Sequence, residues 1–284
     1  MQNAILLPTD FSENAWTATR YGAQLAIKYN FALHILHVYS SIGRIMATAD
    51  FNEELDSFQQ NKAELKIDEW AQKINAEFPS LSISRACIQG NLSDIILELI
   101  GDNPISFVVM GTNGVSGLTE KLIGSNTFEI IQKSPIGVIA VPHETNIFRL
   151  QKIGLLTNFK PDERTLLKTF TSRTGPAMKV SLLHVWENKE HPIEADITFW
   201  KNQLIEETNI ENITFNSIEM TNRLDYKNPI PECIAELSKK ENVDILLVSY
   251  TRKSFFKALF SRSLVKTLTY KIKIPMFFLN AEQI

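Results

Sequence analysis

Three glycines and two polar residues carry the clearest chemical signal in the sequence. Gly111 directly follows a short apolar run, and Gly114 comes three positions later. Gly124 is followed by Ser125 and Asn126, where a helical pattern begins. Glycine has no Cβ to keep a ligand off the main chain, and the free N–H groups and dipole of a helix start favour an anion. The spacing predicts a phosphate-binding loop, with ordinary turns and an N-cap as the alternative interpretation.

The pattern Gly-x2-Gly-x9-Gly-Ser between two apolar strands resembles the nucleotide-binding signature of the universal stress protein family. It differs from a Walker A loop, because no Gly-Lys-Ser/Thr follows the glycines, and from the tighter Gly-x-Gly-x-x-Gly of a dinucleotide fold. An arginine often follows the second glycine in that family, and here this residue is Val115. The charge of that arginine is therefore absent unless Lys121 supplies it.

The resemblance implies an adenine nucleotide site, for ATP with or without Mg2+, built from several segments. Asp10 matches the aspartate that contacts adenosine, and Val38 matches the residue whose backbone meets the adenine. Capping of a turn or helix is the alternative role for Asp10. Any Mg2+ would be held mainly by phosphate oxygens and water, so we expect neither a protein metal site nor catalytic residues. The implied site consists of Thr9, Asp10, Val38, Met110, Gly111, Gly114, Gly124, Ser125 and Asn126.

Short apolar strands alternate with helical patterns through the first half of the chain. Strands are expected at 4–7, 33–39, 81–88, 106–111 and 137–141, and helices at 12–29, 49–78, 92–100 and after Gly124. This alternation predicts a doubly wound α/β fold, with helices on both faces of a five-stranded parallel sheet. The resemblance implies the strand order 3-2-1-4-5, which would place Asp10 beside Gly111.

The long helical pattern over 49–78 carries an apolar stripe of six residues among many charged ones. We expect its apolar stripe to pack in the core and its charges to form a solvated face, rather than a partner site. The stripe consists of Phe51, Leu55, Phe58, Leu65, Trp70 and Ile74.

Histidine and cysteine residues give no sign of a metal site. His34 and His37 lie three apart on one expected strand, so they point to opposite faces and are predicted to be structural. Cys87 and Cys233 fall in different halves and are expected to be buried free thiols, as suits a reducing cytoplasm.

The strand pattern restarts after a polar joint near residues 143–151. Residues 153–159 parallel 5–11, and 180–186 parallel 33–39, while the last two strands of the first half recur at 244–249 and 274–279. The repeat predicts two tandem domains, 1–145 and 146–284. Single-domain family members commonly pair through their last strands. The resemblance thus implies that the halves form a pseudo-twofold pair through 138–141 and 276–279, and it leaves a further homodimer open.

The second half has lost the glycines of the first. Ser249, Arg252 and Arg262 stand where Gly111, Gly114 and Gly124 stand, and Asn158 replaces Asp10. Side chains there would fill the space that a phosphate needs, so we expect a domain with a degenerate motif. The basic and aromatic stretch 250–262 could bind another anion or nucleic acid, but an amphipathic helix is the preferred interpretation.

Composition limits the partners of the chain. It has 284 residues, 44% of them hydrophobic, with 29 basic and 32 acidic side chains and a net charge of −3. This balance offers no general attraction for nucleic acid or anionic membrane. Apolar runs are shorter than the roughly 20 residues of a membrane span, and no signal peptide is evident. A cytoplasmic protein is expected.

These observations support three hypotheses. The leading one is a stress-response protein that binds ATP as a regulatory or sensing ligand without substantial catalysis. The second is a weak ATPase, which needs groups to place the nucleophile and neutralise charge, with Glu120 and Lys121 as the candidates in the loop. The third is a scaffold that binds no nucleotide.

Overall fold

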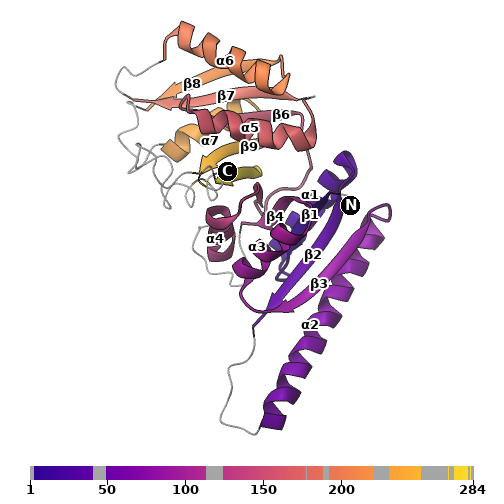
Figure 1. Ribbon diagram of the computed structural model, residues 1–284. Coiled ribbons are helices and arrows are strands. Elements are labelled where there is room, and N and C mark those ends of the chain that lie inside the picture. The colour runs from indigo at the N-terminus through magenta and orange to yellow at the C-terminus, as the bar shows by residue number, and fades with distance from the viewer. Residues whose placement is uncertain are drawn as a thin grey trace.

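The computed structural model describes residues 3–40, 49–112, 124–176, 178–187, 192–220, 230–250, 268, 272–280 and 282. Ten strands and seven helices are described, and they alternate along most of the chain (Figure 1). The strands are β1 (Ala4–Pro8), β2 (Ala32–Tyr39), β3 (Ile83–Gln89), β4 (Ile105–Gly111), β5 (Val138–Val141), β6 (Lys152–Leu156), β7 (Lys179–Trp186), β8 (Ile213–Glu219), β9 (Ile245–Tyr250) and β10 (Met276–Asn280). The helices are α1 (Glu13–Tyr29), α2 (Ala49–Glu77), α3 (Leu92–Asp102), α4 (Ser125–Lys133), α5 (Pro161–Thr174), α6 (Glu194–Thr208) and α7 (Ile230–Lys240).

All ten strands belong to one sheet, in the order β3-β2-β1-β4-β5-β10-β9-β6-β7-β8. Neighbouring strands are parallel within each half, whereas β5 and β10 are antiparallel, with Ile139 opposite Phe277. Each half has the same order of its own five strands, 3-2-1-4-5. The predicted fold class and strand order are therefore confirmed.

The two faces of the sheet carry separate hydrophobic cores. Side chains alternate along a strand, so Phe107 and Val109 of β4 enter one core, and Val108 and Met110 enter the other. Residues of α1, α2, α5 and α6 belong to the first core, and residues of α3, α4 and α7 to the second. Both cores continue from one half to the other across β5 and β10.

The helix starts and ends follow local rules. Ser12, just before α1, caps the helix by accepting a hydrogen bond from the backbone N–H of Ala15. α2 ends two residues before Pro79, in keeping with the bias against helix just before proline. Among the described residues, no helix combines the length and apolar character needed to cross a bilayer.

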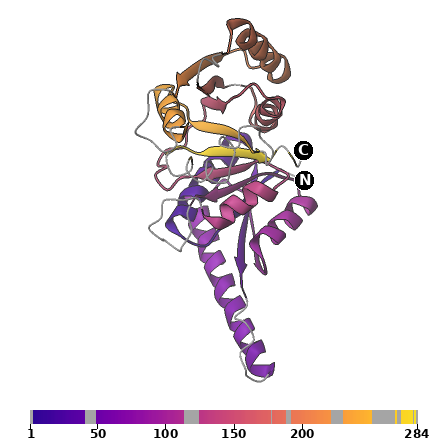
Figure 2. The same ribbon diagram turned by 90° about the vertical axis from the view of Figure 1, so that its left-hand side faces the viewer.

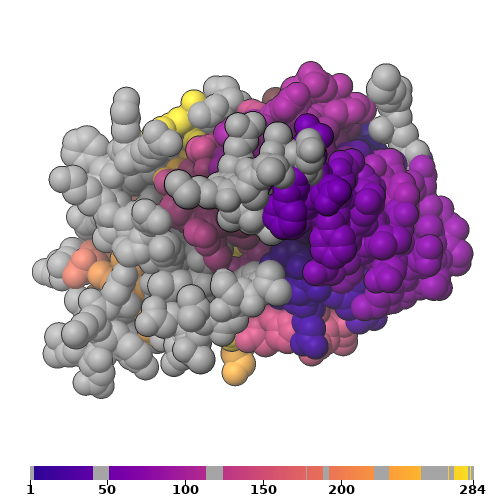
Figure 3. All heavy atoms as spheres, turned by 90° about the horizontal axis from the view of Figure 1, so that it is seen from below, coloured from indigo at the N-terminus to yellow at the C-terminus, as the bar shows by residue number. Residues whose placement is uncertain are grey.

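The expectation that the whole stripe of α2 packs in the core is wrong. Trp70 and Ile74 are buried, but Phe51, Phe58 and Leu65 are 48%, 65% and 66% exposed. The 29-residue helix is about 43 Å long, whereas the seven-residue strand β3 beside it spans about 23 Å. α2 therefore projects beyond the sheet (Figures 1 and 2). Seen from below, the purple atoms of α2 lie in the right half of the view, and the orange and yellow atoms of the second half lie in the left half (Figure 3).

The two cysteines are free, as predicted. Cys233 is fully buried, whereas Cys87 on β3, at the edge of the sheet, is only partly buried. Burial raises the pKa of the Cys87 thiol to about 11, and Glu64 adds to the effect.

Candidate functional site

A cavity of about 450 Å3 opens at the carboxyl edge of the first-half strands. Its walls come from the ends of β1, β2, β3 and β4 and from the first turn of α4. Parallel α/β sheets place ligands at this edge. Gly114 lies outside the described residues, and the other eight residues of the implied site all line the cavity: Thr9, Asp10, Val38, Met110, Gly111, Gly124, Ser125 and Asn126.

The turn after β1 brings Thr9 and Asp10 to the cavity. Phe11 has a φ of 63°, and its N–H donates to Thr9 Oγ1 over 3.0 Å. Asp10 Oδ1 accepts from the N–H of Ser12, also over 3.0 Å. The capping role considered for Asp10 is thus present, and it coexists with the position of this residue on the cavity wall.

His37 holds this turn against β2. Its Nδ1 lies 2.8 Å from the carbonyl oxygen of Thr9, and a carbonyl can only accept, so Nδ1 carries the proton. The ring packs against Phe11 at a centroid distance of 4.4 Å. His34, in contrast, contacts Ser84, and burial lowers its pKa. Both histidines contact protein groups, and among the described residues no cluster of His, Cys, Asp or Glu could hold a metal ion.

Short hydrogen bonds tie the start of α4 to the end of β4. The N–H of Gly124 donates to the carbonyl of Thr112 over 2.7 Å, and Thr127 Oγ1 donates to the carbonyl of Gly111 over 2.9 Å. A Cβ on Gly111 would lie 2.7 Å from Asn14 Oδ1. Close packing of α1 is therefore one reason for glycine at position 111, besides the expected approach of a ligand.

Three helices begin at this edge, and their N-termini are satisfied differently. Ser12 caps α1, and Asn91 Oδ1 caps α3 by accepting from the N–H groups of Ser93 and Asp94. Gly124 provides no side-chain cap for α4. The first-turn N–H groups and the dipole of α4 thus face the cavity without a side-chain acceptor from the N-cap position.

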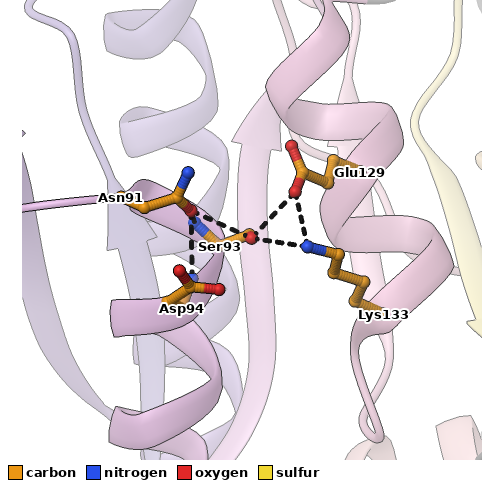
Figure 4. A network of polar contacts seen from close by, with 5 residues as sticks. All are labelled: Asn91, Ser93, Asp94, Glu129 and Lys133. Atoms are coloured by element: carbon orange, nitrogen blue, oxygen red, sulfur yellow. Dashed lines mark hydrogen bonds and ion pairs between the residues drawn. The ribbon is translucent and has the colours of Figure 1, made fainter.

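A polar network joins α3 to α4 beside the cavity (Figure 4). Ser93 Oγ lies 2.9 Å from Glu129 Oε1 and 3.0 Å from Lys133 Nζ, and Lys133 also pairs with Glu129 at 2.6 Å. The hydrogen bond from Lys133, and secondly that from Ser93, lower the pKa of Glu129. The network links the start of α3 to the middle and the last residue of α4.

Asn91 lines the cavity but is absent from the site implied by the sequence. Its carboxamide oxygen accepts hydrogen bonds from the backbone N–H groups of Ser93 and Asp94 at the start of α3, and the nitrogen points away from that helix (Figure 4). The signal in the sequence was its place between Gly90 and the helical pattern that begins at Leu92, which is typical of an N-cap.

The second half repeats this turn geometry. Phe159 has a φ of 60°, and His184 Nδ1 lies 2.8 Å from the carbonyl of Thr157, as Phe11, His37 and Thr9 are arranged in the first half. The hydroxyl of Ser249, at the position of Gly111, donates to Asp162. Arg252 and Arg262, together with the rest of the stretch 251–262, lie outside the described residues.

A buried carboxylate stands in the second half at the position equivalent to Ala15. Glu163 stands six residues after Thr157, as Ala15 of the cavity wall stands six residues after Thr9. It is 1% exposed, and it accepts from Thr157 Oγ1 at 2.5 Å and from the N–H of Asn158 at 2.7 Å. Burial raises the pKa of Glu163 to about 8, against the opposing effect of these hydrogen bonds.

Comparisons with known proteins point in one direction. A model described as the universal stress protein family matches residues 1–142. Universal stress protein MJ0577 of Methanocaldococcus jannaschii is 25% identical over 160 residues, 51% of this chain and 98% of that protein. Universal stress protein YxiE of Bacillus subtilis is 28% identical over 149 residues, 50% of this chain and 99% of that protein. The crystal structure of a universal stress protein from Archaeoglobus fulgidus, at 21% identity, matches the fold over 99% of both chains with a TM-score of 0.72.

Proposed function

Because the chain belongs to the universal stress protein family, we propose that its first half binds ATP, together with Mg2+, as a regulatory or sensing ligand in a cytoplasmic stress response. One observation carries the proposal. The start of α4, which has no side-chain cap from Gly124, opens into a cavity that Asp10 also lines. An anionic group at the helix start and a hydroxyl-bearing group beside the carboxylate are what this pair of features suits.

Each part of the nucleotide has a counterpart on the cavity wall. In the proposed complex, Asp10 accepts from the ribose hydroxyls, and the backbone of Val38 meets the adenine. The loop of Gly111, Gly114 and Gly124, with Ser125 and Asn126, surrounds the phosphates. Met110 and Thr9 complete the wall, and Mg2+ is held by phosphate oxygens and water.

The cavity suits binding better than phosphoryl transfer. A volume of about 450 Å3 falls within the range of small-molecule sites. Phosphoryl transfer needs cations around the transferred group, and no lysine or arginine is among the described residues that line the cavity. Glu120 and Lys121 lie outside the described residues. We therefore propose a bound effector rather than a substrate.

Thermal unfolding with and without ATP and Mg2+ tests this function. At about a hundred times the dissociation constant, ATP stabilises the protein by about 2.7 kcal/mol, or about 5 °C in Tm for a chain of this size. Asp10→Ala removes the shift. Asn158→Ala, at the equivalent position of the second half, keeps it.

Three results would contradict the proposal. An equal loss of the shift in both variants would place the effect outside the first-half cavity. No shift in the parent at millimolar ATP would favour the scaffold without nucleotide. Release of phosphate in proportion to protein concentration, abolished by Asp10→Ala, would favour the weak ATPase.

A further inference from the structure

Helix α2 carries two apolar faces. The inner face is buried against the sheet and consists of Ala63, Ile67, Trp70 and Ile74. Phe51, Phe58 and Leu65, spaced seven residues apart, form a second line that we name the outer stripe. Leu65 follows Ala63 by two residues and so lies about 200° further round the helix. The outer stripe therefore faces away from the sheet.

The outer stripe presents large apolar side chains to solvent where α2 projects beyond the sheet (Figures 1 and 2). Phe58 and Leu65 are 65% and 66% exposed. Single exposed apolar residues are ordinary, but a line of them along one helix face marks an interaction surface.

Charges on either side of Phe58 are arranged in a self-complementary way. Glu54 lies four residues before Phe58 and Lys62 lies four residues after it, and both are exposed. Residues four apart share a helix face. The helix therefore carries a negative charge on the N-terminal side of Phe58 and a positive charge on its C-terminal side. Phe51 and Leu65 lie at equal distances beyond them.

We propose that α2 pairs with α2 of a second copy of this chain, antiparallel and with the twofold axis at Phe58. This arrangement places Glu54 against Lys62 of the partner subunit, and Lys62 against the partner's Glu54. Phe51 meets the partner's Leu65, and the two Phe58 rings meet on the axis. An isologous interface needs such self-complementarity. A single twofold axis at Phe58 pairs the opposite charges and also pairs the apolar side chains of the outer stripe.

Other features favour a second copy over a different occupant. β5 and β10, whose edges could pair two copies, are already joined within the chain. The projecting part of α2 also exposes Glu53, Glu54 and Asp56, so it repels anionic lipid and nucleic acid. One helix pair lies at the low end of interface sizes, below about 1,200 Å2, so the dimer is weak and forms at high protein concentration.

Charge exchange gives the sharpest test, with sedimentation velocity from low to high micromolar protein as the readout. Glu54→Lys and Lys62→Glu each place like charges together at both symmetry-related contacts, so each weakens dimerisation about tenfold or more. The double variant restores opposite charges and dimerises within about threefold of the parent. Unchanged circular dichroism and Tm show that every variant is folded.

Cysteine cross-linking tests the position of the axis. Phe58→Cys brings two thiols together, and mild oxidation yields a covalent dimer. Gln60→Cys is the control, because Gln60 is exposed but lies about 200° round the helix from Phe58. The native thiols do not compete, since Cys233 is buried and the pKa of Cys87 is raised to about 11.

Three outcomes would overturn the proposal. One is a parent chain that stays monomeric throughout the concentration range. Another is a dimer that is indifferent to the charge variants, or that cross-links equally through both cysteine positions. The third is a monomer that floats with phosphatidylcholine vesicles, which would assign the outer stripe to a lipid surface. No cavity residue takes part, so the result does not depend on nucleotide binding.

Discussion

At the scale of single residues, the two halves differ where Ala15 lines the cavity of the first half and the buried Glu163 stands at the equivalent position of the second. The hydrogen bonds from Thr157 and Asn158 orient the carboxyl group of Glu163, but burial opposes its ionisation and raises its pKa from 4.5 to about 8. Glu163 is therefore protonated in the folded protein at a pH where it is ionised in the unfolded chain.

Stability is expected to fall as the pH rises from about 4.5 to about 8, because only the unfolded chain releases this proton in that window. Below the window both states are protonated, and above it both are ionised. Glu163→Gln keeps an acceptor for Asn158 and removes the titration. Urea unfolding should show a flatter pH profile and a gain at pH 8 on the order of a few kcal/mol. An unchanged profile in Glu163→Gln would contradict this assignment.

Asn91 is expected to serve the proposed nucleotide as well as the helix. Asn91→Ser and Asn91→Asp both keep an N-cap for α3, so Tm without ligand should change little. Both remove the amide donor from the cavity wall, and the aspartate adds a negative charge. Calorimetric titration should show ATP affinity reduced several-fold by serine and about tenfold or more by aspartate. Affinity like that of the parent in both variants would leave Asn91 with the capping role alone.

At the scale of elements, the link between α3 and α4 rests on a buried hydroxyl and an exposed ion pair, which differ in energetic weight. Ser93 is 2% exposed, whereas the side chains of Lys133 and Glu129 are 42% and 40% exposed. Exposed pairs contribute little because water and salt screen them. A buried hydroxyl that loses its partners leaves groups unsatisfied.

Ser93→Ala is therefore expected to lower the free energy of unfolding by about 1 kcal/mol, and Lys133→Ala by less than about 0.5 kcal/mol. Urea unfolding at low and high salt measures both. A larger cost for Lys133→Ala, or one that persists in high salt, would show that the ion pair is the main link.

The elements also show what the sequence could predict. Apolar and glycine patterns are local, so they predicted the strands and the start of α4, whereas the placement of Asp10 beside Gly111 followed from the strand order that the family resemblance implied. The projection of α2 beyond the sheet was not predictable from the sequence. Periodicity identifies the apolar faces of a helix but not the length of the sheet beneath it. Glu163 was missed for a similar reason. A glutamate in a first helical turn ordinarily complements the helix dipole in solvent, and its burial depends on the turn after β6.

At the scale of the whole molecule, an aromatic cluster connects the halves. Phe277 of β10 lies 5.8 Å from Phe107 of β4 and 4.9 Å from Phe170 of α5, measured between ring centroids. A Cβ on Gly137 would overlap the Phe277 ring, so the backbone before β5 also packs on it closely. The proposed domains 1–145 and 146–284 thus share part of their core.

We expect the halves to unfold together, because each loses core contacts when the other opens. Phe277→Ala should cost about 3–5 kcal/mol and lower the denaturation midpoint of both halves. The tryptophans report each half separately: Trp16→Phe/Trp70→Phe leaves Trp186 and Trp200, and Trp186→Phe/Trp200→Phe leaves the first pair. Two separate midpoints, or a Phe277→Ala shift in the second-half signal alone, would argue for independent domains.

The buried Glu163 also bears on how many ligand sites each chain offers, and so on how steeply the protein would respond to ligand concentration. A pair of identical subunits offers two equivalent sites, so occupancy of one can alter the other and make the response steep. Here the first half has the cavity, and the second half has the buried Glu163 at the position equivalent to Ala15. Under the proposed function we therefore expect each chain, as a monomer, to take up a single nucleotide with a hyperbolic titration curve, so that the signal follows effector concentration gradually rather than at a threshold.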